Sequence, residues 1–264
     1  MKLVTWNVNS LRARLPRVLE LLAKHDPDVV LLQETKVAPD LFPCDELAVA
    51  GYEACHHSAG QWAGVAVLAR SGLGLTDIRT GLPGEVRAEE ARWIEADVAG
   101  LGLRVASAYV VNGREVGSPT FDEKLAFLDA IAARAGALRA DAAAALVIGG
   151  DFNVAPADAD VYDPAAFAGA THVTAPERER VAAILQAGDL VDAYRAVHPD
   201  EPQFTWWDYR QGHFHRGLGM RIDLLLVGAG LAGRLRACGI DRDLRKGTKP
   251  SDHAPLLADL EDAT

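Results

Sequence analysis

The sequence predicts an α/β fold in which two mixed β-sheets pack face to face and helices cover their outer sides. Some strand candidates follow one another after a short turn, as Arg92–Val98 and Leu103–Tyr109 do across Gly100 and Gly102, which is typical of an antiparallel hairpin. Other strand candidates are separated by a helical pattern, which is typical of a parallel connection. Because both kinds occur, two mixed sheets fit the pattern better than one parallel, doubly wound sheet. Apolar residues make up 49% of the chain, enough for a substantial core.

The strand candidates are short runs rich in apolar residues. Lys2–Val8 alternates apolar and polar residues, as a half-buried strand does, whereas Asp28–Leu32 is a short apolar run. The other candidates are Val65–Ala69, Arg92–Val98, Leu103–Tyr109, Ala144–Ile148, Phe204–Trp206, Arg221–Leu226 and Ala254–Leu260. Gly149 and Gly150 follow one of these runs, and their missing side chains allow another segment to approach closely just before Asp151.

Three segments carry apolar residues at helical spacing: Leu15–Lys24, Phe121–Arg139 and Glu177–Ala187. The first ends at the Asp26-Pro27 pair, because proline disfavours a helical conformation in the residue before it. The second is the longest helical pattern in the chain, and the third is closed by Gly188.

The chain of 264 residues has no linker-like stretch and no repeat, and its polar motifs come from both ends. We therefore expect residues 1–264 to form a single domain. The first residues lack the apolar core of a signal peptide, and the longest apolar run, Leu224–Gly233, is far shorter than the ~20 residues that span a bilayer. The three cysteines form no CxxC pair, which argues against a disulfide framework and a structural zinc site. We expect a monomer in the cytoplasm, without a membrane partner.

The net charge of −10 argues against a nucleic-acid ligand, but the charge is unevenly spread. Residues 203–250 contain nine Lys or Arg against four Asp or Glu, and they include an aromatic cluster, Phe204, Trp206, Trp207 and Tyr209. Aromatic rings beside basic residues are typical of proteins that bind distorted nucleic acid. Two simpler interpretations stay open: a solvated charged surface, and core packing for one of the two tryptophans.

Five segments place polar residues near the ends of apolar or alternating runs. They are TWNVNS at 5–10, LLQETK at 31–36, AYVVNG at 108–113, IGGDFNVAP at 148–156 and KPSDHAP at 249–255. Strand ends are where a sheet presents catalytic groups to a cleft. Their carboxylates, amides, phenol and imidazole are the groups that hydrolysis of a phosphate ester needs.

Asp151 and Asn153 are one residue apart, so in an extended segment both point to the same side and could hold a water and a phosphoryl oxygen. An Asx turn after a strand is the simpler interpretation of this pair. His253 could contact a phosphate oxygen when protonated, and Asp223 could accept its other N–H and fix its tautomer. A surface histidine beside a carboxylate is the alternative here.

The remaining candidates supply oxygen atoms. Glu34 follows an apolar strand, Asp252 could bind a cation, and Asn7 could reach the same cleft. Tyr109 closes an alternating strand, where its phenol could stabilise developing charge, although ordinary packing is the alternative. Because the candidate ligands are oxygens, Mg²⁺ is favoured over Zn²⁺. The other histidines are predicted to be surface residues: 25, 56, 57, 172, 198, 213 and 215.

Together these segments resemble those of the exonuclease III and apurinic/apyrimidinic (AP) endonuclease family, within the endonuclease–exonuclease–phosphatase superfamily. The resemblance runs from Trp6 to Pro255 in the family's order. GDFN and SDHAP are shared across the superfamily, whereas LLQETK, YVVNG, FTWWDYR and KPSDHAP in combination are specific to the DNA-repair branch. The resemblance implies a four-layer α/β sandwich and a Mg²⁺-dependent phosphodiesterase, with Mn²⁺ as an alternative metal. Such an enzyme cuts double-stranded DNA 5′ to abasic sites and removes nucleotides or blocking groups from 3′ ends.

The resemblance also implies roles for the metal-binding residues. Glu34 would be the principal metal ligand, with Asn7 and Asp252 nearby. The other residues that could join this ligand set are Asp151, Asn153 and His253.

For catalysis, the resemblance implies that Asp151 is the general base and that Asn153 stabilises the pentavalent transition state. Tyr109 would act as an acid or oxyanion stabiliser. His253, oriented by Asp223, would contact the scissile phosphate.

For DNA binding, the resemblance implies contacts from Trp206, Asn112 and Arg114. Val111 stands where the family usually has proline, and the doubled Trp206-Trp207 leaves open which ring faces the DNA.

Two other functions fit part of the pattern. A superfamily hydrolase acting on a small phosphoester, such as an inositol phosphate or phospholipid head group, would have less use for the basic aromatic stretch. The other alternative is a DNA-binding protein with an inactive site. Against it, this sequence has a residue for every acid, base and donor role.

Overall fold

A computed structural model describes residues 1–141 and 145–262 and shows the two mixed sheets that the sequence predicts. The first sheet contains, in spatial order, β11 (Leu235–Ile240), β12 (Leu256–Leu260), β1 (Lys2–Asn7), β2 (Val29–Gln33), β4 (Val65–Arg70) and β3 (Tyr52–His57). The second contains β5 (Leu75–Thr80), β6 (Trp93–Val98), β7 (Leu103–Tyr109), β8 (Ala145–Asp151), β10 (Asp223–Gly228) and β9 (Leu190–Asp192). The pairs β1–β2 and β7–β8 are parallel, while their other neighbours run antiparallel.

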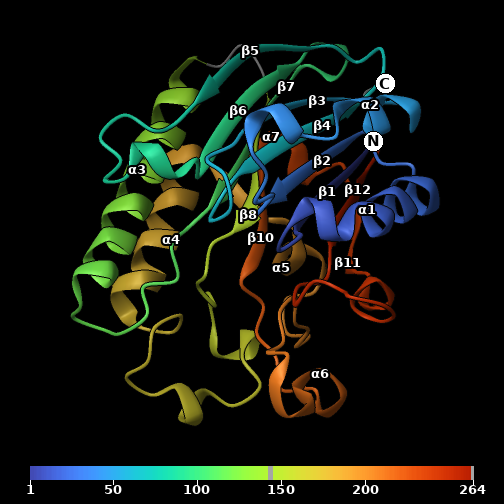
Figure 1. Cartoon of the computed structure of the whole chain (residues 1–264). Helices are drawn as coiled ribbons and strands as arrows, with labels where there is room; N and C mark the ends of the chain where they lie inside the picture. Colours follow the sequence, from blue (N-terminus) through green and yellow to red (C-terminus); the bar gives the residue numbers. More distant parts are fainter. Residues whose placement is uncertain (142–144, 263–264) are drawn as a thin grey trace.

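Helices cover the outer side of both sheets (Figure 1). The helices are α1 (Leu11–His25), α2 (Cys44–Val49), α3 (Pro119–Asp141), α4 (Ala175–Gly188), α5 (Ala193–Val197), α6 (His213–Arg216) and α7 (Ala229–Ala232). The long helices α3 and α4 pack together beside the second sheet, and α1 lies on the opposite side of the molecule (Figure 1). None of the helices in the described residues combines the length and hydropathy that a bilayer crossing requires.

Three apolar layers hold this sandwich together. Between the sheets, Leu31 and its neighbours meet Val147 and Leu225 of the second sheet. Outside the second sheet, residues such as Ile131 of α3 pack against it, and Leu21 of α1 does the same at the first sheet. The central strands are therefore buried on both faces, which is why they appear in the sequence as apolar runs.

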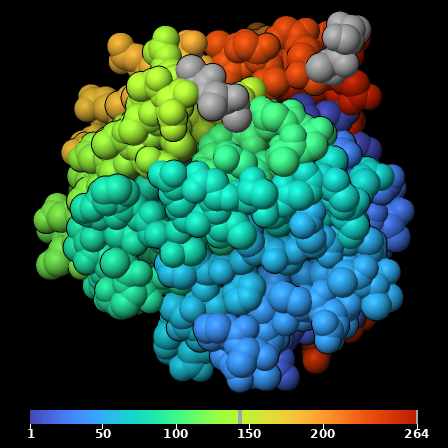
Figure 2. Space-filling model, turned by 90° about the horizontal axis from the view of Figure 1, so that it is seen from above, coloured from blue at the N-terminus to red at the C-terminus, as the bar shows by residue number. Residues whose placement is uncertain are grey.

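Residues from the two ends of the chain lie side by side, as the view from above shows at one edge of the molecule (Figure 2). Strand β1 pairs with β12, and the amino group of Met1 donates to the carbonyl of Leu260 at 2.9 Å. The first and last strands thus share one sheet.

Gly149 and Gly150 allow the close approach that the sequence predicts. A Cβ on Gly149 would lie 2.6 Å from Leu31 Cδ1 of the facing sheet, and one on Gly150 would lie 2.0 Å from the carbonyl oxygen of Ala108. Both distances are shorter than carbon atoms tolerate, so these positions exclude larger residues.

Some element predictions were wrong. Phe204–Trp206 is not a strand, because Trp206 makes only isolated bridges to Met220 and His253. Four strands were missed, namely β3, β5, β9 and β11, and they are the four outermost strands of the two sheets. Edge strands are exposed to solvent and lack continuous apolar runs; β5, for example, is exposed along nearly all its length. Ala144, predicted to begin a strand, lies outside the described residues, and β8 begins at Ala145.

Candidate functional site

The polar motif residues meet where the central strands of both sheets end. In the first sheet Asn7 pairs with Gln33, and Glu34 follows directly. In the second sheet Tyr109 pairs with Asp151, which pairs on its other side with Asp223. The strand register, set by apolar runs buried on both faces, therefore brings distant segments to one edge of the sandwich.

A cluster of three metal-competent side chains lies at this edge. One ligand atom each from Glu34, Asp151 and His253 lies within 4.8 Å of the others. Asn7 joins the two carboxylates, because its Nδ2 donates to Glu34 Oε1 at 2.8 Å and to Asp151 Oδ2 at 2.9 Å. Its own Oδ1 accepts from the backbone N–H of Asn9 at 3.0 Å, which fixes this orientation. Asn7 thus faces the carboxylates with its amide nitrogen, and its role as a metal ligand stays a prediction.

The electrostatics of this cluster favour a cation. Burial raises the pKa of Asp151 to about 7; the charges of Asp223 and Glu34 add to this effect, and His253 opposes it. Two carboxylates brought together in a buried site repel one another unless a positive charge joins them. The carboxylate oxygens of Glu34 and Asp151 fit Mg²⁺ or Mn²⁺, because both ions take oxygen ligands. The residues present therefore fit the metal that the sequence predicts.

His253 is held as an imidazolium by the carboxylate behind it. Its Nδ1–H donates to Asp223 Oδ2 at 2.8 Å, and its Nε2 lies 3.7 Å from Asp151 Oδ2. Burial alone would lower the pKa of His253, but the charges of Asp223 and Asp151 and the hydrogen bond to Asp223 raise it to about 10. Asp223 thus orients the imidazole, as the sequence predicts, and keeps the other nitrogen available as a donor.

Asp151 and Asn153 adopt the turn that was left open as the alternative interpretation. The backbone N–H of Asn153 donates to Asp151 Oδ1 at 2.9 Å, and Asn153 has a positive φ of 51°. Its Nδ2 also donates to the carbonyl of Val110 at 2.9 Å. The turn and the site are compatible, because the turn fixes both side chains at the cluster.

Tyr109 lies beside the cluster as a neutral donor. Burial, reinforced by the charge of Glu34, raises the pKa of its phenol well above the usual value. The guanidinium of Arg92 stacks over the ring at 4.6 Å. An ionised Tyr109 is therefore disfavoured, and its hydroxyl can donate to developing negative charge.

Asp252 lies next to the cluster rather than in it. Its Oδ1 accepts from Asn9 Nδ2 at 2.9 Å and its Oδ2 accepts from the indole N–H of Trp206 at 3.1 Å. Asn9 in turn accepts from Lys36 Nζ at 2.7 Å, and Lys36 also pairs with Glu34 at 2.5 Å. A direct metal bond from Asp252 stays a prediction.

The two adjacent tryptophans have different environments. Trp207 is fully buried, whereas Trp206 is only partly buried and reaches the site through Asp252. Of the two rings, Trp206 is therefore the one that is accessible to a substrate.

Asn112 and Arg114 lie in the loop after β7. Asn112 Nδ2 lies 3.4 Å from Asn153 Oδ1, and its Oδ1 accepts from the backbone N–H of Arg114 at 3.1 Å. Arg114 is exposed and has a positive φ of 53°. Asn112 thus touches the site, while Arg114 is exposed two residues further along the same loop.

Behind Asn153 lies a buried network that the sequence did not predict. Lys124 of α3 donates to the carbonyl of Asn153 at 2.7 Å and pairs with Glu177 of α4, and both side chains are fully buried. His172, predicted to be a surface residue, is buried, and its Nδ1–H donates to the same carbonyl at 2.5 Å. Burial, helped by the charge of Lys124, lowers the pKa of His172 to about 4, so this histidine is neutral. A Lys in a predicted helix gives no signal of burial, because its partner lies far along the sequence.

Comparisons with known proteins give the family. The model of the endonuclease/exonuclease/phosphatase family matches residues 4–253. The chain is 32% identical to exodeoxyribonuclease III of Haemophilus influenzae, covering 99% of this chain and 100% of that protein.

Solved structures agree over the whole fold. The 3′-5′ exonuclease NExo from Neisseria meningitidis superposes with a TM-score of 0.93 at 39% identity, covering 99% of this chain and 100% of that one. A Neisseria structure described as the 3′ phosphatase NExo bound to a product DNA hairpin gives 0.94 at 39% identity and covers 99% of both chains. An AP endonuclease from Archaeoglobus fulgidus gives 0.92 at 34% identity, again covering 99% of both chains.

Proposed function

The chain belongs to the endonuclease/exonuclease/phosphatase family and is a phosphodiester-hydrolysing DNA-repair nuclease, and on this basis we propose how its site works and what it cuts. The observation that supports the proposal most directly is the cluster of Glu34, Asp151 and His253, with Asp223 behind the imidazole. Asp151 and His253 are buried, and Glu34 is partly exposed. The cluster combines a metal-binding carboxylate, a base and a cationic donor within a few ångströms.

Glu34 would be the principal ligand of Mg²⁺ or Mn²⁺, with Asn7 and Asp252 nearby. When bound, the metal would neutralise charge on the phosphate and on the leaving oxygen. The protein's own groups supply the remaining chemistry.

Asp151 accepts the proton of the attacking water, because its pKa of about 7 suits a base at neutral pH. Asn153 would donate to a phosphoryl oxygen from the Nδ2 hydrogen that here points to Asp151 Oδ2 at 3.3 Å. His253, charged at neutral pH, donates from Nε2 to a non-bridging oxygen, and Asp223 stabilises the imidazolium. Tyr109 donates from its neutral hydroxyl as negative charge develops.

The proposed substrate is duplex DNA, cut 5′ to abasic sites and trimmed or unblocked at 3′ ends. An abasic nucleotide has no base to unstack, so bringing it to the cluster costs little. Trp206, Asn112 and Arg114 lie around the cluster and would contact the DNA there. We also propose that residues 1–264 form one catalytic domain that acts as a cytoplasmic monomer.

The test is an end-labelled duplex with one central abasic site, incubated with Mg²⁺ or with EDTA. Cleavage at the abasic site shows incision, and a ladder from the 3′ end shows resection. A 3′-phosphate on a second duplex reports end cleaning. Absence of all three in the presence of Mg²⁺ would overturn the proposal.

The residue-level test is Asp151→Asn. We expect it to abolish cleavage while binding to abasic DNA stays nearly intact, since only the base is lost. Asp200→Asn, the same change at an exposed position, is the matched control and should behave like the wild type. Unchanged turnover in Asp151→Asn would refute the assigned base.

A further inference from the structure

A pocket separate from the catalytic cluster lies near the edge of the sandwich where that cluster is found. It has a volume of about 270 Å³, and its wall includes the side chains of Tyr209, His213, Phe214, Arg245 and Lys246. Most of these residues come from the loop around α6 and from the turn that precedes the KPSDHAP motif. Its wall is thus largely aromatic and basic.

Arg245 is a buried cation that meets no carboxylate in the described part of the chain. Its side chain is 6% exposed and stacks on Tyr209 at 4.9 Å and on Phe214 at 5.2 Å. Its terminal nitrogen donates to the carbonyl of Trp207 at 3.3 Å, while Nε is buried and has no hydrogen-bond partner among the described residues. Within residues 1–141 and 145–262, no carboxylate lies within 4.0 Å of this guanidinium. Burying an unpaired charge is unfavourable, so such a group indicates that an anion is expected from outside.

The acidic residue of this pocket does not neutralise Arg245. Asp208 also lines the wall, but it is paired with Arg210 at 2.6 Å. Lys246 pairs with Asp243 at 2.5 Å on the exposed rim. The pocket therefore keeps an excess positive charge at Arg245.

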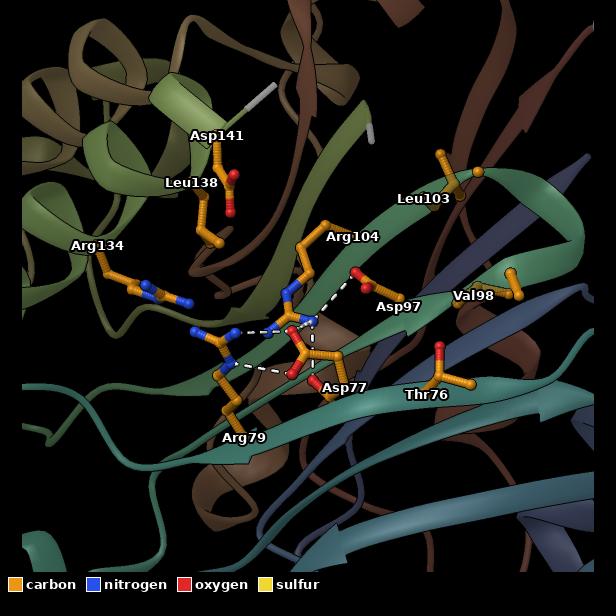
Figure 3. Close-up of a pocket in the computed structure, with 12 residues that line it drawn as sticks. Thr76, Asp77, Arg79, Asp97, Val98, Leu103, Arg104, Arg134, Leu138 and Asp141 are labelled. Carbon is orange, nitrogen blue, oxygen red and sulfur yellow. Dashed lines mark hydrogen bonds and ion pairs between the residues drawn. The ribbon is translucent and has the colours of Figure 1, made fainter. Parts of the chain in front are cut away.

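A similar pocket at the far end of the second sheet shows the contrast. It has a volume of about 280 Å³ and is lined by Arg104, which is as deeply buried as Arg245. There Arg104 donates to Asp77 and to Asp97, both at 3.1 Å, and these contacts are drawn in Figure 3. Because the guanidinium of Arg104 is already neutralised, the pocket around Arg104 needs no anion from outside.

The Arg245 pocket is connected to the catalytic cluster by a short chain of contacts. The hydroxyl of Tyr209 donates to the carbonyl of Pro250 at 2.9 Å and accepts from Arg14 at 3.1 Å. Arg14 donates to the carbonyl of Asn9 at 2.6 Å, and Asn9 donates to Asp252 beside the cluster. A polyanion bound at the cluster could therefore extend over this pocket.

We propose that the Arg245 pocket binds a backbone phosphate of the DNA substrate, separate from the phosphate that is cleaved. The guanidinium offers parallel N–H donors that match phosphate oxygens, and the rings of Tyr209 and Phe214 hold its plane in place. This inference rests on the proposed function, because it assigns a further contact to the same DNA substrate.

The test measures how DNA binding depends on salt, in the cleavage-deficient Asp151→Asn background and with a duplex oligonucleotide. Each phosphate contact contributes about 0.9 to the slope of log affinity against log salt concentration. Arg245→Gln should make the slope less negative by about this amount and should weaken binding roughly tenfold at low salt. Arg242→Gln is the matched control, because Arg242 also stacks on Phe214, at 5.4 Å, but does not line the pocket. Its slope should remain that of the parent.

Two results would overturn the inference: an unchanged slope in Arg245→Gln, or an equal change in both variants. If Arg245→Gln fails to fold in thermal melting, Lys246→Glu replaces it, because its side chain is 61% exposed and stands at the pocket rim. That variant should also weaken DNA binding severalfold, and unchanged binding would refute the site. Failure of the proposed function is distinguishable, since it would appear as absent cleavage with Arg245 intact.

Discussion

Replacing Lys124 by methionine tests the buried network behind Asn153. Lys124 and Glu177 are both fully buried, and Lys124 also donates to the carbonyl of Asn153 at 2.7 Å and to Thr171 Oγ1 at 3.1 Å. Methionine fills much of the same volume but leaves the Glu177 carboxylate buried without its cation. Removing one partner of a buried pair costs about 3–5 kcal/mol, a large part of the roughly 5–15 kcal/mol that stabilises a folded domain.

Urea denaturation measures this loss as a shift of the midpoint. With a slope of about 3 kcal/mol per molar, the expected loss lowers the midpoint by about 1 M or more. Arg180→Met is the matched control, because Arg180 pairs with Asp129 across the same two helices but on the exposed surface. That exposed pair should contribute less than about 1 kcal/mol.

Adding Glu177→Gln to Lys124→Met should recover part of the lost stability, because the uncompensated charge is then removed. If Lys124→Met destabilised the protein no more than Arg180→Met does, the ion pair would not stabilise the fold as we describe.

Three further predictions concern the site itself. Trp206→Ala should impair substrate selection more than folding. Trp207→Ala should instead lower the free energy of unfolding by about 3–5 kcal/mol, because Trp207 is fully buried. Equal melting temperatures for the two variants would contradict this. Adding Mg²⁺ should raise the melting temperature of the wild type, because a ligand that binds the folded state stabilises it. The Glu34→Gln variant should lose most of that rise. An equal rise in both proteins would argue against Glu34 as a metal ligand. The pKa of His253 is raised to about 10 in the folded protein, compared with ~6.5 in the unfolded chain. The charged imidazole therefore contributes its full stabilisation of the fold below pH ~6.5, and this contribution is lost as the pH rises through about 10. Asp223→Asn removes the largest charge that raises this pKa, so in EDTA that loss should begin at lower pH, and an unchanged pH profile of unfolding would refute the pairing.

The sequence predicted the interior of the fold better than its borders. Strands such as β2 are buried on both faces, so their apolar runs were visible without any structure. The four missed strands are the sheet edges, where solvent exposure permits polar residues such as those of β5. Phe204–Trp206 shows the opposite error, because an aromatic run that packs against loops has the composition of a strand without its pairing.

The convergence of the motif residues was predicted to the extent that strand ends define it. Glu34, Asp151 and His253 do converge, and Asp223 does lie behind the imidazole. The sequence could not show that Asp252 differs from the three residues of the cluster. In the structure both of its carboxylate oxygens accept hydrogen bonds, one from Trp206 and one from Asn9.

The sequence by itself determined which segments are buried and which polar residues follow them, because both depend on the order of residues along a strand. The tertiary structure alone decided which of two adjacent tryptophans is in the core and that His172 is neutral and buried. It also decided that Arg245 meets no carboxylate among the residues that the structure describes. Those properties depend on contacts between residues that are far apart in the chain. Local periodicity predicts the side to which a residue points, but the partner it meets there is set only when the layers pack together.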